Sequence, residues 1–160
     1  GHLGQSIYLR EIEGREEGAA PSVDLALEKK HGDFVRELIK AGRVDTCHDV
    51  SDGGLAVALA EMSLPRGIGA SVGLAGQADA IAFWFGEDQA RYVIAAPFAQ
   101  AEKIVAEARA AGITVAELGK TGGDRITLDD KAGIGVASLK DGFEGWFPGF
   151  MSGEEVPVTN

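Results

Sequence analysis

A polar turn between two apolar segments, at residues 46–55, constrains this chain more than any other stretch. The turn follows an apolar strand, contains two aspartates, a histidine, a serine and a glycine pair, and leads into residues 53–64. That second segment is apolar on nearly all sides, so we expect a buried helix. A buried helix directly after a strand indicates a layered fold that mixes both kinds of element.

The turn has the composition of a ligand-binding loop and also that of an ordinary helix start. A helix N-terminus presents free backbone N–H groups and partial positive charge, which suit an anion. Neighbouring carboxylates would repel a bare phosphate but suit a phosphate carried on Mg²⁺, which prefers oxygen ligands. Alternatively, Ser51 or Asp52 is an N-cap and the glycines serve a tight turn. The binding candidates of this turn are His48, Asp49, Ser51, Asp52, Gly53 and Gly54.

Charge and cysteine content exclude several classes of protein. A net charge of -10 over 160 residues argues against a nucleic-acid binder and against an anionic membrane surface. The single cysteine, Cys47, excludes an internal disulfide and a cysteine-based zinc site. No apolar run approaches the length that spans a bilayer. We therefore expect a cytoplasmic, acidic domain, either processed or excised from a longer chain because neither an initiator Met nor a signal peptide precedes Gly1.

Strands and helices alternate along the chain. Apolar periodicity predicts helices at residues 24–41, 53–64, 97–111 and 139–147, with a helical turn at 80–85. It predicts strands at 3–9, 44–50, 67–74, 91–96, 113–119, 125–128 and 134–138, with a hairpin turn at 122–124. This order predicts an α+β or α/β fold, a mixed sheet with helices packed on it. We expect residues 1–150 to form a single domain and residues 151–160 a flexible tail.

A second candidate loop lies at residues 86–89, directly before an apolar strand. Its polar side chains, Glu87 and Gln89, either bind a ligand or hydrogen-bond locally. Sheets that mix strands and helices place ligands at strand ends, which is where both candidate loops lie. The common signatures of a phosphate-binding P-loop, a nucleophile elbow and a zinc protease are missing from the sequence.

Three segments carry a resemblance to a known family. They read Leu-Gly-Gln-Ser-Ile-Tyr-Leu at residues 3–9, Cys-His-Asp-Val-Ser-Asp-Gly-Gly-Leu at the start of residues 47–62, and Phe-Gly-Glu-Asp-Gln-Ala-Arg-Tyr-Val at 85–93. In this order they resemble the large synthetase subunit of the phosphoribosylformylglycinamidine synthases, within the AIR-synthase-related superfamily of purine biosynthesis. The resemblance covers essentially the whole chain and is to the C-terminal domain of the second of two repeats.

The resemblance implies a fold and, for the longer protein, a reaction. Each repeat of such a subunit has an N-terminal domain and a C-terminal α/β domain, and the repeats form a pseudo-dimer. The whole enzyme would convert formylglycinamide ribonucleotide, ATP and glutamine-derived ammonia into the amidine, ADP and phosphate, with Mg²⁺ as the metal. Its implied partners are the upstream domains of its own chain, a glutaminase subunit and a small third subunit. A homodimer of the isolated chain stays open.

The resemblance also implies roles for single residues. Asp49 aligns with a magnesium-binding aspartate of the first repeat, and Glu87 with a glutamate that contacts substrate there. Asp88 departs from the Glu-Ser-Gln form of that motif, and the family's catalytic histidine belongs to another domain. We therefore expect a non-catalytic copy, inactive alone, that completes the pseudo-dimer and a nucleotide or magnesium pocket. A purely structural module, or another superfamily member such as aminoimidazole ribonucleotide synthase or selenophosphate synthetase, is the alternative.

Overall fold

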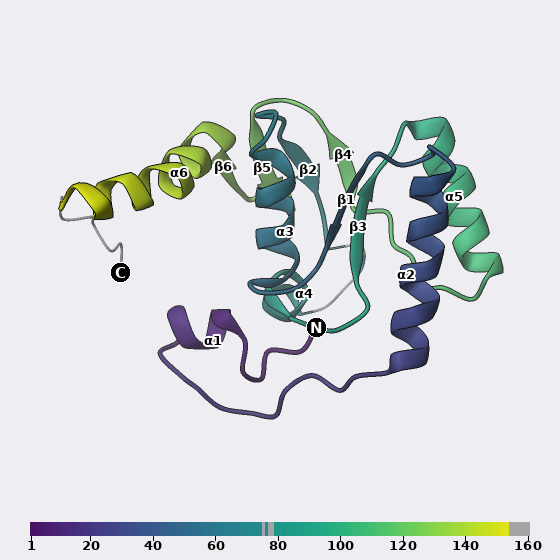
Figure 1. Cartoon of the computed structure of the whole chain (residues 1–160), viewed down its shortest axis with the longest axis horizontal. Coiled ribbons are helices and arrows are strands. Elements are labelled where there is room, and N and C mark those ends of the chain that lie inside the picture. The colour runs from purple at the N-terminus through teal and green to yellow at the C-terminus, as the bar shows by residue number, and fades with distance from the viewer. Residues whose placement is uncertain (75, 77–78, 154–160) are drawn as a thin grey trace. The chain divides into compact units, whose positions relative to one another are not determined.

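The computed structural model describes residues 1–74, 76 and 79–153. Its chain divides into two compact units, of which the first comprises residues 1–62 and 74–118 and the second residues 63–73 and the chain from Gly119 onward. The elements (Figure 1) are α1 (Ile7–Glu11), α2 (Leu25–Lys40), β1 (Thr46–Asp49), α3 (Gly54–Ser63), β2 (Ala70–Val72), α4 (Ala80–Phe85), β3 (Tyr92–Ala95), α5 (Phe98–Ala110), β4 (Gly119–Thr121), β5 (Arg125–Leu128), β6 (Ala132–Gly135) and α6 (Val136–Ser152).

The first unit is built on a two-stranded antiparallel ribbon of β1 and β3, with Thr46 opposite Ala95 and Asp49 opposite Tyr92. Helices α2 and α5 contribute Leu38 and Ile104 to a buried core that also includes Val44. Partly buried side chains of Phe34, Cys47, Ile94 and Ala96 pack against that core. Burial of these apolar side chains, at roughly 1.5–3 kcal/mol for each large one, stabilises the ribbon that carries the candidate turn.

Helix α2 begins and ends where local signals in the sequence place it. The Asp24 carboxylate is the N-cap and accepts hydrogen bonds from the N–H groups of Ala26 (2.9 Å) and Leu27 (3.0 Å). Such a cap is worth about 1 kcal/mol to a helix. At the other end Gly42 adopts a φ of +65°, the left-handed conformation in which glycine ends a helix. Helix α3 also fits its predicted range, and Leu55, Ala58 and Leu59 on it are buried.

The second unit contains a four-stranded mixed sheet in the order β4-β2-β5-β6. Strand β2 is antiparallel to β4 and parallel to β5, and β5 forms an antiparallel hairpin with β6. Ala70, Val72, Ile126 and Val136 are the buried apolar residues of this unit. Helix α6 follows β6 directly, and Figure 1 shows it leading away from the sheet. Among the helices of the described residues, none is both long and apolar enough to cross a bilayer.

The predicted first strand, residues 3–9, is wrong. Residues from Ile7 form the short helix α1, whose N-cap is Ser6. The Ser6 side chain is 2% exposed and accepts a hydrogen bond from the Leu9 N–H (3.3 Å). Ile and Tyr favour strands, but an N-cap serine in extended conformation (φ −75°, ψ 156°) starts a helical turn. The cap therefore outweighs the β-propensity of the residues that follow it.

The end of the predicted fold also needs correction. Strand β4 begins only at Gly119, so residues 113–118 precede it, and β2 lies between β4 and β5 where a hairpin through 122–124 was expected. Strand β6 and helix α6 both begin earlier than predicted, and α6 extends through Ser152 instead of ending at residue 147. The strands are divided between two separate sheets, one of two strands and one of four. The predicted class, mixed strands and helices, is confirmed, while the rest of the predicted tail, 154–160, lies outside the described residues.

Candidate functional site

The turn between β1 and α3 brings the start of α3 against the end of α4. Gly54 has a φ of +69°, and a Cβ added there would lie 2.7–2.8 Å from backbone atoms of Trp84 and Phe85. Real side chains do not fit such a gap, so only glycine permits this approach. Ser51 and Asp52 are exposed, and the Ser51 carbonyl accepts a hydrogen bond from the Gly54 N–H (2.9 Å). The glycine pair thus places the start of α3 beside the second candidate loop.

Glu87, from that second loop, occupies the backbone N–H groups at two helix starts. Its Oε1 atom accepts a hydrogen bond from the N–H of Gly53 (2.8 Å), directly before α3, and from the N–H of Ile7 (2.9 Å), the first residue of α1. A carboxylate at a helix start is stabilised by both the charge-assisted hydrogen bonds and the helix dipole. The anion-binding position predicted at α3 therefore holds a carboxylate of the protein itself.

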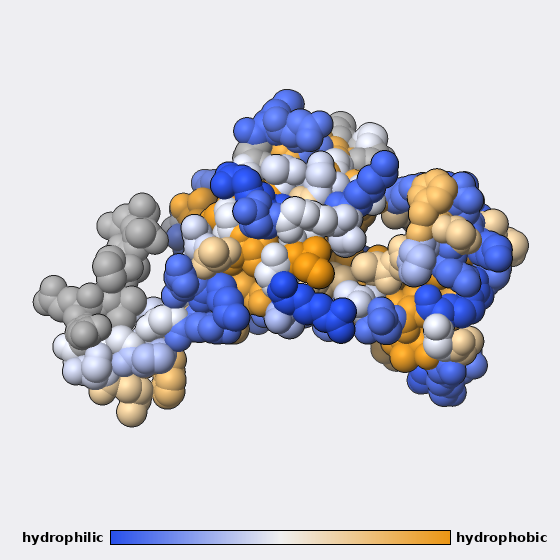
Figure 2. All heavy atoms as spheres, turned by 90° about the horizontal axis from the view of Figure 1, so that it is seen from above, coloured by the Kyte–Doolittle hydropathy of each residue, from blue (hydrophilic) through white to orange (hydrophobic). Residues whose placement is uncertain are grey.

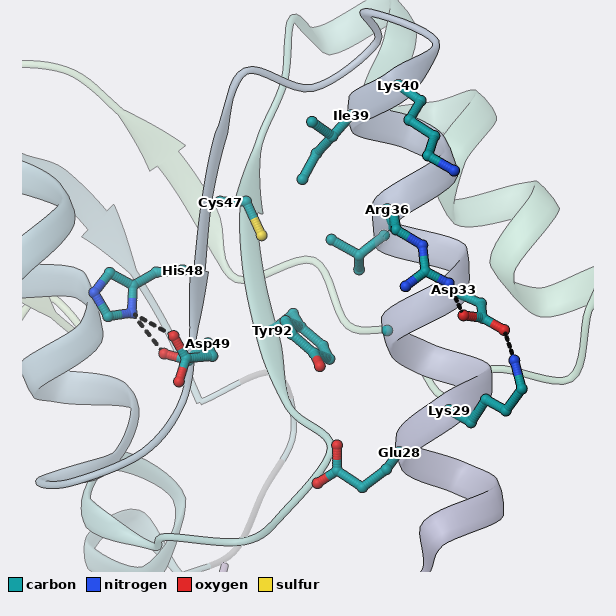
Figure 3. Close-up of a pocket in the computed structure, with 12 residues that line it drawn as sticks. Glu28, Lys29, Asp33, Arg36, Ile39, Lys40, Cys47, His48, Asp49 and Tyr92 are labelled. Carbon is teal, nitrogen blue, oxygen red and sulfur yellow. Dashed lines mark hydrogen bonds and ion pairs between the residues drawn. The ribbon is translucent and has the colours of Figure 1, made fainter.

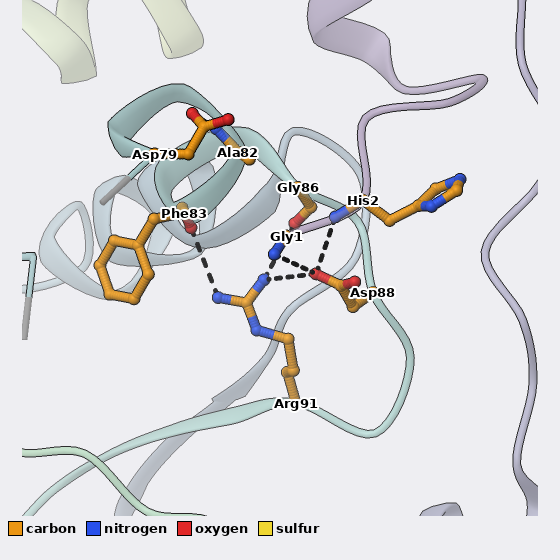
Figure 4. Close-up of polar contacts among 8 residues, drawn as sticks. All are labelled: Gly1, His2, Asp79, Ala82, Phe83, Gly86, Asp88 and Arg91. Atoms are coloured by element: carbon orange, nitrogen blue, oxygen red, sulfur yellow. Dashed lines mark hydrogen bonds and ion pairs between the residues drawn. The ribbon is translucent and has the colours of Figure 1, made fainter. Parts of the chain in front are cut away.

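The next side chain of the loop, Asp88, is held by local contacts (Figure 4). Its Oδ2 atom accepts a hydrogen bond from the His2 N–H (3.1 Å) and pairs with the Arg91 guanidinium (3.3 Å). The same guanidinium donates to the carbonyl oxygens of Gly86 (3.1 Å) and Phe83 (3.5 Å). Asp88 and Arg91 thus fasten the loop to the end of α4.

Two side chains of helix α2 contact the backbone at the end of the same loop. Ala90 has a φ of +62°, which is uncommon for a residue with a side chain. Its N–H donates to Glu28 Oε1 (2.8 Å), and its carbonyl oxygen lies 2.8 Å from His31 Nδ1. Glu28 and His31 are spaced i, i+3 and share one side of α2. Sequence reasoning missed both roles. The spacing of Glu28 and His31 was visible, but their shared partner, Ala90, lies 62 and 59 residues away and was not.

An open groove of about 930 Å³ lies between α2 and the β1–β3 ribbon (Figure 3). From the ribbon, Cys47, His48, Asp49 and Tyr92 line it, and α2 supplies charged side chains on the other wall. Burial, followed by the charge of Asp49, raises the pKa of the Cys47 thiol. A raised pKa lowers the thiolate fraction at neutral pH, which is typical of a packed cysteine and unlike a nucleophilic one.

The charges on the α2 wall of the groove are largely matched within the helix. Asp33 forms ion pairs with Lys29 and with Arg36, as Figure 3 shows. The hydrogen bond from Lys29 is the main cause that lowers the pKa of the Asp33 carboxyl, and the charges of Lys29 and Arg36 add to it. Because these side chains are exposed, water screens the pairs and they add little stability.

The structure does not gather the predicted site residues in one place. Asp49 lines the groove and its side chain is 66% exposed, whereas Glu87 lies at the two helix starts and is not among the residues that line the groove. The His48 ring contacts Glu61 of α3 (Nε2 to Oε2, 3.2 Å) and the Asp49 carbonyl oxygen (2.6 Å). Gln89 is exposed. The structure therefore brings Glu87 together with Gly53 but does not place Glu87 in the groove with Asp49.

Asp49 alone does not make a metal site. Within the described part of the chain, no three side chains of His, Cys, Asp and Glu gather in a way that could hold an ion. Mg²⁺ is often held by one or two carboxylates together with phosphate oxygens and water. The described residues around Asp49 therefore do not by themselves form a complete set of ligands for an ion.

Comparison with known proteins places the fold in a family. Residues 1–131 match the family model described as AIR synthase related protein, C-terminal domain. The phosphoribosylformylglycinamidine synthase subunit PurL of Methylocella silvestris is 53% identical over 152 residues, covering 95% of this chain and 21% of that protein. The chain thus spans about a fifth of the length of the curated relatives it matches.

Solved structures share the fold at low sequence identity. Thermotoga maritima PurL complexed with FGAR matches with a TM-score of 0.69 at 18% identity, covering 88% of this chain and 26% of that one. The same protein complexed with ATP matches with a TM-score of 0.64 at 20% identity, covering 88% and 24%. Since the family model covers most of its residues, this chain belongs to the AIR synthase related family, whose C-terminal domain it represents.

Proposed function

We propose that this chain is the C-terminal domain of the large subunit of a cytoplasmic phosphoribosylformylglycinamidine synthase. The longer polypeptide would use ATP and glutamine-derived ammonia to convert formylglycinamide ribonucleotide into the amidine, with a glutaminase subunit and a small third subunit as partners. The PurL subunit of Methylocella silvestris, which is 53% identical to this chain, supports this assignment. T. maritima PurL, which shares the fold, has been solved in complex with FGAR and with ATP, and this supports the proposed substrate and nucleotide.

Within that enzyme we assign the domain a non-catalytic role: it completes the pseudo-dimer. One observation carries this proposal: Glu87, which aligns with a substrate-contacting glutamate of the other repeat, accepts hydrogen bonds from Gly53 (2.8 Å) and Ile7 (2.9 Å). A carboxylate whose Oε1 atom is bound by two backbone N–H groups is held in place by the protein itself. Its work is to hold α1, α3 and the loop of residues 86–91 together.

Asp49 is the remaining candidate for a ligand role. It is exposed at the end of β1 and could supply one oxygen to a magnesium ion that carries nucleotide phosphates. When bound, such an ion would neutralise phosphate charge, and Asp49 would position it. A purely structural domain is the second candidate function, favoured by the contacts that already occupy Glu87 and Asp88.

Two measurements test the proposal. With formylglycinamide ribonucleotide, MgATP and ammonium chloride, we expect the longer polypeptide to release ADP and the 160-residue chain to release none above the blank. Amidine formation by the isolated chain would contradict the non-catalytic role. Failure of the longer polypeptide to use this substrate would contradict the assignment itself.

Calorimetric titration of the longer polypeptide with MgATP separates the nucleotide pocket from a purely structural role. We expect Asp49→Ala to weaken one class of MgATP site about tenfold or more. The matched control is Asp45→Ala, an exposed aspartate just before the same strand. Equal MgATP binding by the Asp49→Ala variant, the control and the unmodified protein would favour the structural module.

A further inference from the structure

Helix α6 carries an apolar stripe, most of which is exposed. Phe143, Trp146, Phe147 and Phe150 follow the i, i+3, i+4, i+7 spacing that places side chains on one helix face. Each is between 51% and 66% exposed. The rings of Trp146 and Phe150 stack, with centroids 5.3 Å apart and planes 8° from parallel. Figure 2 shows apolar side chains, in light orange, at the surface of this end of the chain. Exposed apolar side chains gathered on one face are typical of an interaction surface.

The stripe begins at buried residues of the second unit and continues along the exposed part of α6. Val136 is 2% exposed and Leu139 is half-buried, and both share the face of Phe143 at helical spacing. The helix residues from 140 to 148 are then all exposed. Asp141 lies on the opposite face, because it is about half a turn from the stripe at 100° per residue. The exposed stripe is therefore the continuation of a packed face and not an isolated set of surface residues.

The sequence of α6 is unfavourable for a helix that lacks packing contacts. Within its 17 residues the helix contains Gly142, Gly145 and Gly149, as well as Pro148. In a helix interior each glycine costs about 1 kcal/mol relative to alanine and a proline about 3 kcal/mol. Packing of an apolar face supplies most helical stability in proteins. A helix with this composition therefore depends on contacts along its apolar face.

We propose that the α6 stripe docks into an apolar surface on the part of the longer polypeptide that lies outside these 160 residues. The relative in Methylocella silvestris matches over 95% of this chain but is only 21% covered by it, so such a protein has about four-fifths of its residues elsewhere. The family match ends at residue 131, before α6 begins, so α6 lies outside the part of the chain that the family model matches. Aromatic side chains are the residues that most often dominate interface energetics.

Charge disfavours the other occupants. Each chain carries a net charge of -10, which opposes association of two copies and adsorption to an anionic membrane. The inference rests on the proposed function only in the premise that the chain is one domain of a longer polypeptide. Beyond that function, the inference identifies the α6 stripe as the surface of the domain that makes the intramolecular contact.

Photo-crosslinking in the longer polypeptide tests the inference. We expect the variant Phe147→p-benzoylphenylalanine to crosslink, within a single polypeptide, to a peptide outside these 160 residues. The control is Asp141→p-benzoylphenylalanine on the opposite face, for which we expect at least fivefold less of that product. A product of twice the mass would identify a second copy as the occupant, and a crosslink within these 160 residues would identify an internal contact. Either result, or a yield no higher than the control, would overturn the inference.

Hydrogen exchange provides a second measurement that needs no substitution. We expect the amides of residues 136–152 to exchange at least tenfold more slowly in the longer polypeptide than in the 160-residue chain. Equal exchange in the two proteins would show that α6 gains no partner and would overturn the inference. Amidine formation measured on the same sample keeps this failure distinct, because an active enzyme with an exposed α6 would leave the proposed function intact.

Discussion

At the scale of single residues, the Glu87 carboxylate takes the position that an external anion would otherwise occupy. Two helix starts share this carboxylate as an acceptor. Each start thereby satisfies a backbone N–H that has no partner within its own helix. One side chain thereby joins three segments that are distant in sequence. Glu87 therefore contributes to the stability of this part of the chain.

We expect Glu87→Ala to lower the free energy of unfolding of the chain by about 2–4 kcal/mol. The reason is that the N–H groups of Gly53 and Ile7 would lose their acceptor, and hydrogen bonds to charged groups contribute about 1.5–3 kcal/mol each. Urea denaturation followed by circular dichroism measures the change. The neighbouring Gln89→Ala is the control and should stay within about 0.5 kcal/mol, because Gln89 is exposed. Equal effects of the two substitutions would contradict this role for Glu87.

The candidate loops were visible in the sequence, but the partners of their side chains were not. Composition identified the residues from His48 to Gly54 and the pair Glu87 and Gln89 as polar groups at strand ends. Nothing local indicates that the Glu87 carboxylate reaches Ile7, which is 80 residues away. The clasp of Ala90 by Glu28 and His31 was hidden for the same reason.

At the scale of elements, the close approach of α3 to α4 depends on a glycine. The φ of Gly54 is +69°, and its missing side chain leaves room for the backbone of Trp84 and Phe85. This contact places the start of α3 where Gly53 can donate to Glu87. A larger residue at position 54 would displace the helix and weaken that hydrogen bond.

We expect Gly54→Ala to destabilise the chain by about 3 kcal/mol or more, since a Cβ would lie 2.7 Å from the Phe85 backbone in addition to the left-handed strain. Gly42→Ala is the matched control. Its φ is +65°, but the space around the added Cβ is open to 4 Å, so only the strain of about 1 kcal/mol remains. Thermal unfolding of both variants measures the difference. Similar losses for the two would show that the close approach contributes nothing.

A pH-dependent contact joins the end of α2 to α5. Arg43 forms two hydrogen bonds with the Glu107 carboxylate (2.6 and 3.1 Å), which lower the pKa of that carboxyl. A lowered pKa in the folded state means that the contribution is present above the ordinary Glu pKa of about 4.3 and is lost as pH falls through the lowered value.

We therefore expect Glu107→Gln to be less stable than the unmodified chain at pH 7, with a difference that shrinks below pH of about 4. Urea titrations at several pH values between 7 and 3 measure it. Glu102→Gln, an exposed position on the same helix, controls for the loss of one negative charge. A difference that does not change with pH would exclude the ion pair as its cause.

Element prediction succeeded where one local signal was dominant. Apolar periodicity predicted α2 and α3 to within one residue at each end. It failed at α1, where the Ser6 cap opposed the β-propensity of Ile7 and Tyr8. The expected hairpin at 122–124 failed because strand order depends on the insertion of β2 between β4 and β5, a tertiary pairing that no local sequence encodes.

At the scale of the whole molecule, the exposed aromatic stripe of α6 distinguishes this chain from a self-sufficient domain. The 160 residues contain the family domain and a helix beyond it. Stability measured on this chain alone therefore omits whatever α6 gains in the longer polypeptide.

We expect Trp146→Ala to leave the stability of the 160-residue chain within about 0.5 kcal/mol, because Trp146 is 51% exposed. In the longer polypeptide the same substitution should cost about 2–4 kcal/mol, as truncation of a packed aromatic side chain does. Calorimetry of both proteins measures the two effects, with Asp141→Ala as the control that changes neither. A loss confined to the isolated chain, or absent from both, would contradict a docked α6.

The position of β2 in its sheet has a consequence for biosynthesis. Ala70 pairs with Thr121 on one side and with Ile126 on the other, so both neighbours of β2 leave the ribosome about fifty residues after it does. At about 5–20 residues per second, β2 waits for several seconds with two unpaired edges. Unpaired edges invite pairing with other nascent chains, so chaperone contact during translation should concentrate on residues 63–73 until the segment from Gly119 emerges.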